Sequence, residues 1–127
     1  MTSMCSADWE TTNVLQMDGE SVAAQLPAQT QIVTKTWNRV VAVPYMVYMP
    51  EKDRLCMLVG CDYPHQPMIL FSDDHGATWS EPRPIAPDPK VNAAAGLGTS
   101  LTYLGAGRLM LVAGGRWFTD DYGNTWE

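Results

Sequence analysis

Short apolar runs separated by polar turns recur along the chain from residue 40 onward. Most of them are rich in β-branched or other apolar residues and are bounded by Gly, Pro, Asn or Asp, which is typical of β-strands. Pro44 interrupts the first run, because proline cannot donate a hydrogen bond to a central ladder. The runs occupy residues 40–49, 54–61, 68–71, 99–104 and 108–114. The pattern therefore predicts an all-β chain with buried inner strands, and residues 40–49 are expected to be one of them.

Weaker elements lie around these runs. Residues 29–37 alternate and are rich in β-branched side chains, which predicts one more strand. Residues 78–85 predict a strand of edge character, because Pro82 and Pro84 lack a backbone donor. We expect a loop at 62–67, a connector at 87–92 and an irregular lead-in at 1–29.

One nine-residue segment occurs twice in the sequence with small changes. Residues 71–79 read Phe-Ser-Asp-Asp-His-Gly-Ala-Thr-Trp, and residues 118–126 read Phe-Thr-Asp-Asp-Tyr-Gly-Asn-Thr-Trp. Six of the nine positions are identical, and Ser/Thr makes a seventh that is chemically alike. The copies are 118 − 71 = 47 residues apart, and a repeat of about this length is typical of one β-propeller blade.

The motif has the chemistry of a tight β-hairpin turn, and we call residues 71–79 the first turn and residues 118–126 the second turn. Asp73 and Asp120 are expected to accept hydrogen bonds from backbone N–H groups two or three residues on, as in Asx-turns. The glycines allow a positive φ at low steric cost, and each tryptophan is expected to lie back over its turn. The residues assigned to this structural role are Ser72, Asp73, Gly76, Thr78, Trp79, Thr119, Asp120, Gly123, Thr125 and Trp126.

A calcium loop is the functional alternative for the same acidic segment. An EF-hand needs oxygen ligands at alternating positions and a distant bidentate glutamate, and neither copy has that spacing. We therefore expect no metal and no cofactor, and we interpret the segment as structural.

The strand order also recurs around the motif. Arg54 and Arg108 open apolar strands of corresponding sequence, and each strand leads through a short third strand into one copy of the motif. The predicted unit is four antiparallel strands, with the motif joining the third to the fourth. Inner strands that are apolar on both faces need a neighbouring sheet on each side, and the blades of a β-propeller cover one another in this way. The expected organisation is a lead-in at 1–29 and a partial propeller at 30–127, with blades at about 40–86 and 97–127.

The composition is that of a globular, acidic chain. It has 127 residues, of which 46 % are hydrophobic, a net charge of −6 and a pI of about 4.7. Nucleic acids and anionic membranes attract basic patches, so neither is an expected partner. Residues 1–25 have no basic start and no long apolar run, so they predict no signal peptide, and no run reaches the roughly 18 apolar residues of a membrane helix. Cys5, Cys56 and Cys61 match no metal spacing, and we interpret them as buried or free thiols.

In its repeated motif, strand order and apolar second strands, the chain over residues 40–127 resembles the Asp-box (bacterial neuraminidase repeat) β-propellers, whose best-known members are sialidases. The resemblance implies a six-bladed propeller for the complete protein. It also implies a glycoside hydrolase of exo-α-sialidase type, with a sialoside or another glycan as ligand. The Asp-box turn lies away from the catalytic face in this family, and non-enzymatic propellers carry it too.

The resemblance also indicates where a sialidase site would lie. An Arg-Ile-Pro segment is expected to open the first blade, but the corresponding residues read Ala42, Val43 and Pro44. The family further uses a Tyr nucleophile assisted by a Glu, two more arginines, and an acid/base Asp that commonly lies in the loop after the second strand. The catalytic candidate in that loop is Asp62, and the ligand-binding candidates are Arg39, Tyr63 and His65.

Two functions remain open at this level. One is a sialidase-like hydrolase, and the other is a non-catalytic Asp-box propeller that binds glycan or protein. Two explanations also remain for a chain that supplies fewer blades than the about four to eight of a propeller. Either the chain is part of a longer sialidase-like protein, or copies self-associate into a ring in which residues 30–37 of one copy complete the last blade of the next.

Overall fold

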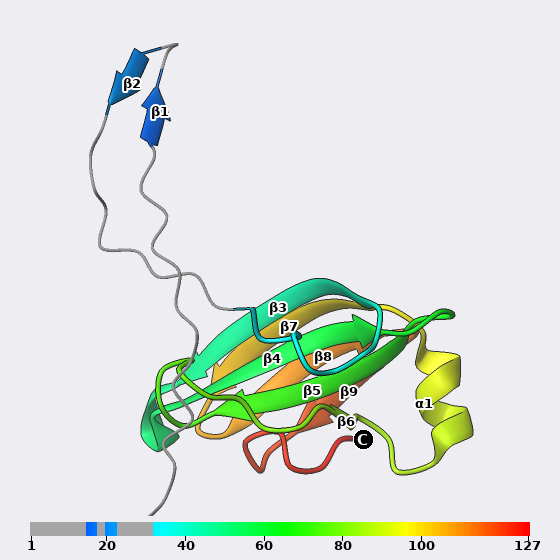
Figure 1. Cartoon of the computed structure of the whole chain (residues 1–127). Helices are drawn as coiled ribbons and strands as arrows, with labels where there is room; N and C mark the ends of the chain where they lie inside the picture. Colours follow the sequence, from blue (N-terminus) through cyan, green and yellow to red (C-terminus); the bar gives the residue numbers. More distant parts are fainter. Residues whose placement is uncertain (1–14, 18–19, 23–31) are drawn as a thin grey trace, which may run out of the picture.

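The computed structural model describes residues 15–17, 20–22 and 32–127, and its elements are mostly β-strands (Figure 1). The strands are β1 (Leu15–Met17), β2 (Glu20–Val22), β3 (Val41–Met49), β4 (Arg54–Cys61), β5 (Gln66–Ser72), β6 (Arg83–Pro84), β7 (Gly98–Gly105), β8 (Arg108–Ala113) and β9 (Arg116–Thr119). A short 3-10 helix, η1 (Pro50–Lys52), joins β3 to β4, and one helix, α1 (Pro89–Ala95), precedes β7. The all-β prediction is confirmed.

The longer strands form two antiparallel sheets. The first sheet has the order β3-β4-β5-β6, and the second sheet has the order β7-β8-β9. Phe71 lies opposite Cys56 in the first sheet, and Phe118 lies opposite Met110 in the second. The two sheets therefore share one register relative to the repeated motif. Beyond the second turn, Glu127 and Phe118 exchange two backbone hydrogen bonds, of 2.8 and 3.0 Å.

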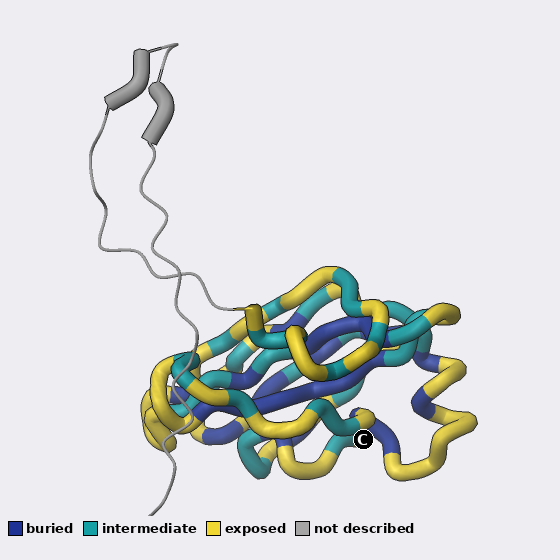
Figure 2. Tube along the Cα trace, in the orientation of Figure 1, coloured by how far each residue is buried: buried dark blue, intermediate teal, exposed yellow. Residues whose placement is uncertain are grey.

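The two sheets are stacked face to face, and the main hydrophobic core lies between them. Leu58 and Ile69 of the first sheet and Leu109 and Leu111 of the second are completely buried there. Burial of one such side chain contributes about 1.5–3 kcal/mol, so the contact between the sheets is a major source of stability. Figure 2 shows the buried residues along the central strands and the exposed residues mainly on α1 and the turns.

A second, smaller core covers the outer face of the first sheet. It is built on Val59, Cys61, Met68 and Leu70, against which Val33, Trp37, Val41, Met57 and Trp79 pack. Residues 32–37 thus occupy part of the face that lies away from the second sheet.

The strand predicted at 40–49 is correct in place but not in burial. Only Met49 of β3 is buried, and the other side chains are half-buried or exposed. β3 lies at the edge of the first sheet, so a single neighbouring strand flanks it within that sheet. The predicted interruption at Pro44 is confirmed, because the register of β3 on β4 shifts between Ala42 and Tyr45.

Three other local predictions are wrong in whole or in part. The strand predicted at 29–37 is a series of turns over residues 33–37, while residues 29–31 lie outside the described residues. The strand predicted at 78–85 is too long, because only β6 pairs with β5, but its predicted edge position is confirmed. Most of the connector predicted at 87–92 belongs to helix α1, which begins at Pro89 and which Asp88 caps by accepting a hydrogen bond from Lys90 N at 2.8 Å.

The lead-in predicted at 1–29 is described only where β1 and β2 pair as a hairpin. The rest of that prediction, with Cys5, lies outside the described residues. Cys56 and Cys61 are buried free thiols that belong to the two different cores, so they face opposite sides of β4. The described residues contain no helix that is long and apolar enough to cross a membrane.

Candidate functional site

The first turn is closed by hydrogen bonds among its own side chains. Ser72 Oγ accepts a hydrogen bond from Gly76 N at 2.8 Å. Asp74 accepts two from Thr78, one from the backbone N at 2.8 Å and one from Oγ1 at 2.5 Å. The indole of Trp79 folds back and donates from Nε1 to Gly76 O at 3.1 Å. Gly76 has a φ of +91°, which explains the glycine at this position.

The second turn repeats these bonds atom for atom. Thr119 Oγ1 accepts from Gly123 N at 3.2 Å. Asp121 accepts from Thr125 N at 2.9 Å and from Thr125 Oγ1 at 2.7 Å. Trp126 Nε1 donates to Gly123 O at 3.0 Å, and Gly123 has a φ of +84°. The repeated sequence therefore builds the same structure twice.

The carboxylate that closes each turn belongs to the second aspartate of the motif, not to the first. Asp73, for which the sequence predicts this role, instead accepts two hydrogen bonds from Arg54, at 2.5 and 3.0 Å. Its counterpart Asp120 is exposed and lines a pocket. Two adjacent aspartates look alike in a sequence, and only the directions in which their side chains leave the backbone separate the two roles.

The turn lowers the pKa of both closing carboxyls. For Asp74 the largest cause is the hydroxyl of Thr78, followed by the backbone N–H of Thr78. For Asp121 partial burial opposes ionisation, but hydrogen bonds, led by that from Thr119, outweigh it and lower the pKa from 3.8 to about 2. These carboxylates are ionised and engaged within their own turns, which suits a structural role better than acid/base chemistry.

The ligand-site candidates gather at the opposite end of the first sheet, beside the loop between β4 and β5. Arg39 donates to both carboxylate oxygens of Asp62, from Nε at 3.1 Å and from Nη2 at 2.5 Å. The hydrogen bond from Arg39 is the largest cause that lowers the pKa of Asp62. The two charged candidates therefore neutralise each other, and Asp62 lacks the raised pKa that a general acid needs.

Tyr63 and His65 lie on the same loop. Tyr63 is 87 % exposed, and its ring meets the His65 ring edge-on, with the centroids 5.8 Å apart. His65 Nδ1 is buried and has no hydrogen-bond partner among the described residues. A Cβ added to Gly60 would lie 3.8 Å from His65 and 2.5 Å from Leu97, so His65 is near the segment that enters β7. The structure thus brings all four candidates to one end of the fold.

A groove that the sequence analysis did not single out lies at this end of the second sheet. It has a volume of about 420 Å³ and runs between α1 and the connection from β8 to β9. Trp117 lines it and donates from Nε1 to Ala113 O at 3.0 Å, and Arg116 adds a charge. The sequence signal was the aromatic and basic pair after Gly114 and Gly115, but the helix that forms the other wall was not predicted.

A tyrosine–glutamate pair occurs at the end that carries the repeated turns. Tyr103 donates its hydroxyl hydrogen to Glu51, which also accepts from Ala106 N at 3.2 Å. The pKa of Tyr103 is raised, first by burial and then by the bond to Glu51. A tyrosine nucleophile needs the opposite shift, so we interpret this pair as a link between η1 and the β7–β8 hairpin.

No three His, Cys, Asp or Glu side chains come together as a metal site anywhere in the described part of the chain. Comparison with protein-family models, with curated proteins and with solved structures found no match for the chain. The functional proposal therefore rests on the repeated sequence and on the geometry of the two ends.

Proposed function

We propose that the two sheets are neighbouring blades of an Asp-box β-propeller. The proposal is supported by the common order of their first three strands, by the same turn at the same register, and by their face-to-face stacking. In a propeller each blade contacts its two neighbours, so both faces of a blade are covered. The strand β4 fits this arrangement, because it contributes side chains to the cores on both faces of its sheet.

We further propose that this propeller binds glycan without cleaving it, through the end that carries Tyr63 and Trp117. The observation that carries this proposal is the ion pair between Arg39 and Asp62, which keeps the candidate acid/base ionised and bound. The exposed ring of Tyr63 and the half-buried ring of Trp117 remain as the contact groups, since an aromatic ring can pack on the apolar face of a sugar. The groove beside Trp117 offers a concave surface for the same ligand.

Binding is tested on a glycan array with the unmodified chain, the Tyr63→Ala variant and the Tyr48→Ala variant. Tyr48 is the matched control, because it is also exposed but reaches Asp53 at the end with the repeated turns. We expect Tyr63→Ala to weaken glycan binding by about fivefold or more, the size of a contact worth about 1 kcal/mol. Equal binding by the two variants, or no binding by the unmodified chain, would contradict the proposal.

The second candidate is sialidase-like hydrolysis, which is favoured by the position of Asp62 beside Tyr63 and His65. It predicts turnover of a fluorogenic sialoside, and a loss of about a hundredfold or more in the Asp62→Asn variant, as for a general acid. Equal turnover in that variant removes Asp62 from the mechanism. Glycan binding without any turnover favours the first proposal.

A further inference from the structure

The same face of the two sheets is covered in one and open in the other. The shared register makes Phe71 equivalent to Phe118. Met49 and Leu104 correspond as the residues that follow Tyr48 and Tyr103, which lie opposite Leu55 and Leu109, although Leu104 itself lies in a register shift. Met49 is 0 % exposed and Phe71 is 9 % exposed, whereas Leu104 is 47 % and Phe118 is 44 % exposed. The first sheet therefore shows which segment covers this face, and it can be compared with the second sheet, where the face is open.

In the first sheet, the cover over Phe71 is the second turn. A Cβ built on Gly123 would lie 3.2 Å from the Phe71 ring, so only glycine allows this approach without a shift of the ring. Arg83 stabilises this contact, because its guanidinium donates hydrogen bonds to Gly123 O at 2.7 Å and to Asn124 O at 3.2 Å. The turn of one sheet thus packs on the phenylalanine that begins the turn of the other. We call the surface around such a phenylalanine the seat of the turn.

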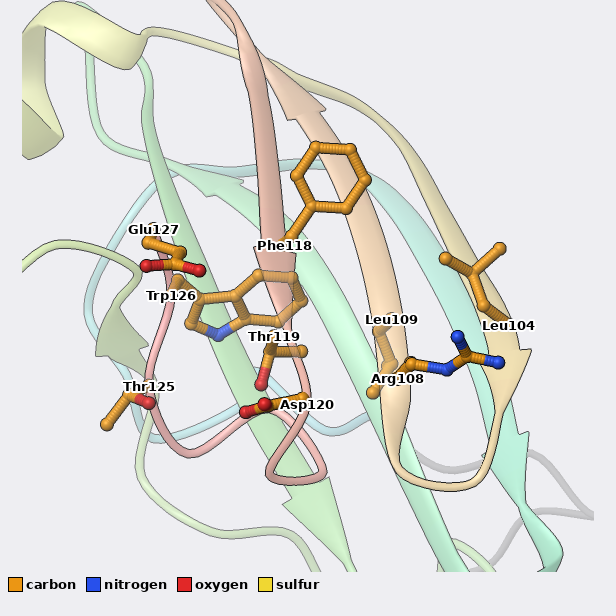
Figure 3. A pocket seen from close by; sticks show the side chains of 9 residues that line it. All are labelled: Leu104, Arg108, Leu109, Phe118, Thr119, Asp120, Thr125, Trp126 and Glu127. Carbon is orange, nitrogen blue, oxygen red and sulfur yellow. The ribbon is translucent and has the colours of Figure 1, made fainter.

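In the second sheet, the equivalent seat is a pocket of about 710 Å³ (Figure 3). Leu104, Phe118 and Trp126 are among its apolar lining residues. Arg108 and Asp120 also line it. They are the counterparts of Arg54 and Asp73, which form an ion pair in the first sheet.

We propose that this pocket binds a second copy of the chain, by receiving that copy's first turn. The first turn has the same internal hydrogen bonds as the second turn, which already occupies the equivalent seat on Phe71. Its glycine, Gly76, has the same left-handed φ. The contact is heterologous: the turn of one copy meets the pocket of the next.

The inference rests on the repeated blade of the proposed function and not on glycan binding. Val33 and Trp37 cover part of the outer face of the first sheet, so the contact is centred on the turn and is small. Small interfaces are weak and transient, so the fraction of associated chains should rise with protein concentration.

The test is sedimentation velocity over a hundredfold range of protein concentration, with two variants that each damage one half of the contact. Phe118→Asp places a charge in the pocket. Gly76→Asn enlarges the turn with a residue that tolerates a left-handed φ. Tyr63→Asp is the control, because it places the same charge on an exposed aromatic position at the other end of the fold.

We expect the unmodified chain and Tyr63→Asp to associate, and each of the two damaging variants alone to remain monomeric. A mixture of Phe118→Asp and Gly76→Asn should form 1:1 dimers that do not grow, since one copy keeps a good turn and the other a good pocket. Thermal unfolding of each variant verifies that it is folded, and Phe118→Lys repeats the pocket test with the opposite charge.

A monomeric unmodified chain at every concentration would overturn the proposal, and so would unchanged association of folded Phe118→Asp. A mixture that stays monomeric would overturn the heterologous arrangement. Glycan binding measured on the same variants distinguishes the two proposals, because Phe118→Asp should bind glycan normally and Tyr63→Asp should not.

Discussion

At the scale of single residues, two neighbouring aspartates have different tasks in each repeated turn. Asp121 closes the second turn through hydrogen bonds from Thr119, Asn124 and Thr125. Asp120 is exposed at the rim of the pocket. The sequence predicts that an aspartate closes the turn, and only the backbone directions decide which one.

The first prediction compares these neighbours directly. Asp121→Ala removes the acceptor for several N–H and O–H groups, so we expect a loss of about 1 to 2 kcal/mol in the free energy of unfolding. Asp120→Ala should change it by less than about 0.5 kcal/mol, as for an ordinary surface residue. Urea unfolding of both variants measures the difference, and equal losses would contradict the assignment of the closing role to Asp121.

The second prediction concerns acid. The pKa of Asp121 is about 2 in the folded protein and is ordinarily 3.8. A lowered folded pKa stabilises the protein above the ordinary value, and this contribution is lost as the pH falls toward the folded value. The Tm advantage of the unmodified chain over Asp121→Asn should therefore be largest above about pH 4 and should shrink toward pH 2. A difference that is constant across this range would show that ionisation of Asp121 does not contribute.

At the scale of elements, the strands follow from the sequence far better than the helix does. β4 begins and ends where its apolar run does, at Arg54 and Cys61, because strand-forming residues and flanking turns agree there. Helix α1 has the signals of a helix start, with Asp88 as N-cap and Pro89 in the first turn. Pro87, Pro89 and the short length of the helix nevertheless make the segment look like a loop.

What holds α1 in place is a buried side chain that the sequence does not mark. Asn92 is 1 % exposed, and its Oδ1 accepts hydrogen bonds from Ile85 N at 3.0 Å and Ala86 N at 3.3 Å. The helix is thereby tied to the chain that follows β6. The contact joins a helix to a loop, so no periodic pattern in the sequence predicts it.

The third prediction tests this link. Asn92→Ala leaves two buried N–H groups without their acceptor, and we expect a loss of about 1 to 3 kcal/mol in the free energy of unfolding. Val91→Ala, on the exposed side of the same helix, should cost less than about 0.5 kcal/mol. Guanidinium unfolding of both variants provides the comparison, and equal effects would mean that the Asn92 bonds are not what fixes α1.

At the scale of the whole molecule, stability depends on the contact between the sheets, and the two copies of the motif differ there. The guanidinium groups of Arg54 and Arg83 lie 5.3 and 5.1 Å from the centroid of the Phe71 ring, and the second turn packs against the same ring. Phe118 occupies the same register but faces an open pocket. Identical residues at equivalent positions therefore have different energetic weight.

The fourth prediction uses this internal comparison. Phe71→Ala opens a cavity between the sheets and should cost about 3–5 kcal/mol, as for large-to-small changes in a core. Phe118→Ala should cost less than about 1 kcal/mol in a dilute, monomeric sample. Differential scanning calorimetry measures both, and similar losses would contradict the view that the described residues fill only one of the two seats.

The sequence by itself determined the all-β class, the repeated turn, the positions of the main strands and the glycines at left-handed positions. These features depend on residues close together in the chain, where side-chain chemistry and backbone geometry act locally. Only the tertiary structure decided which aspartate closes each turn, that Arg39 holds Asp62, and that Phe71 is covered while Phe118 is open. These outcomes depend on groups that meet in space from distant parts of the chain. The repeated motif has nearly the same sequence whether its phenylalanine is covered or open, so the sequence does not separate the two cases.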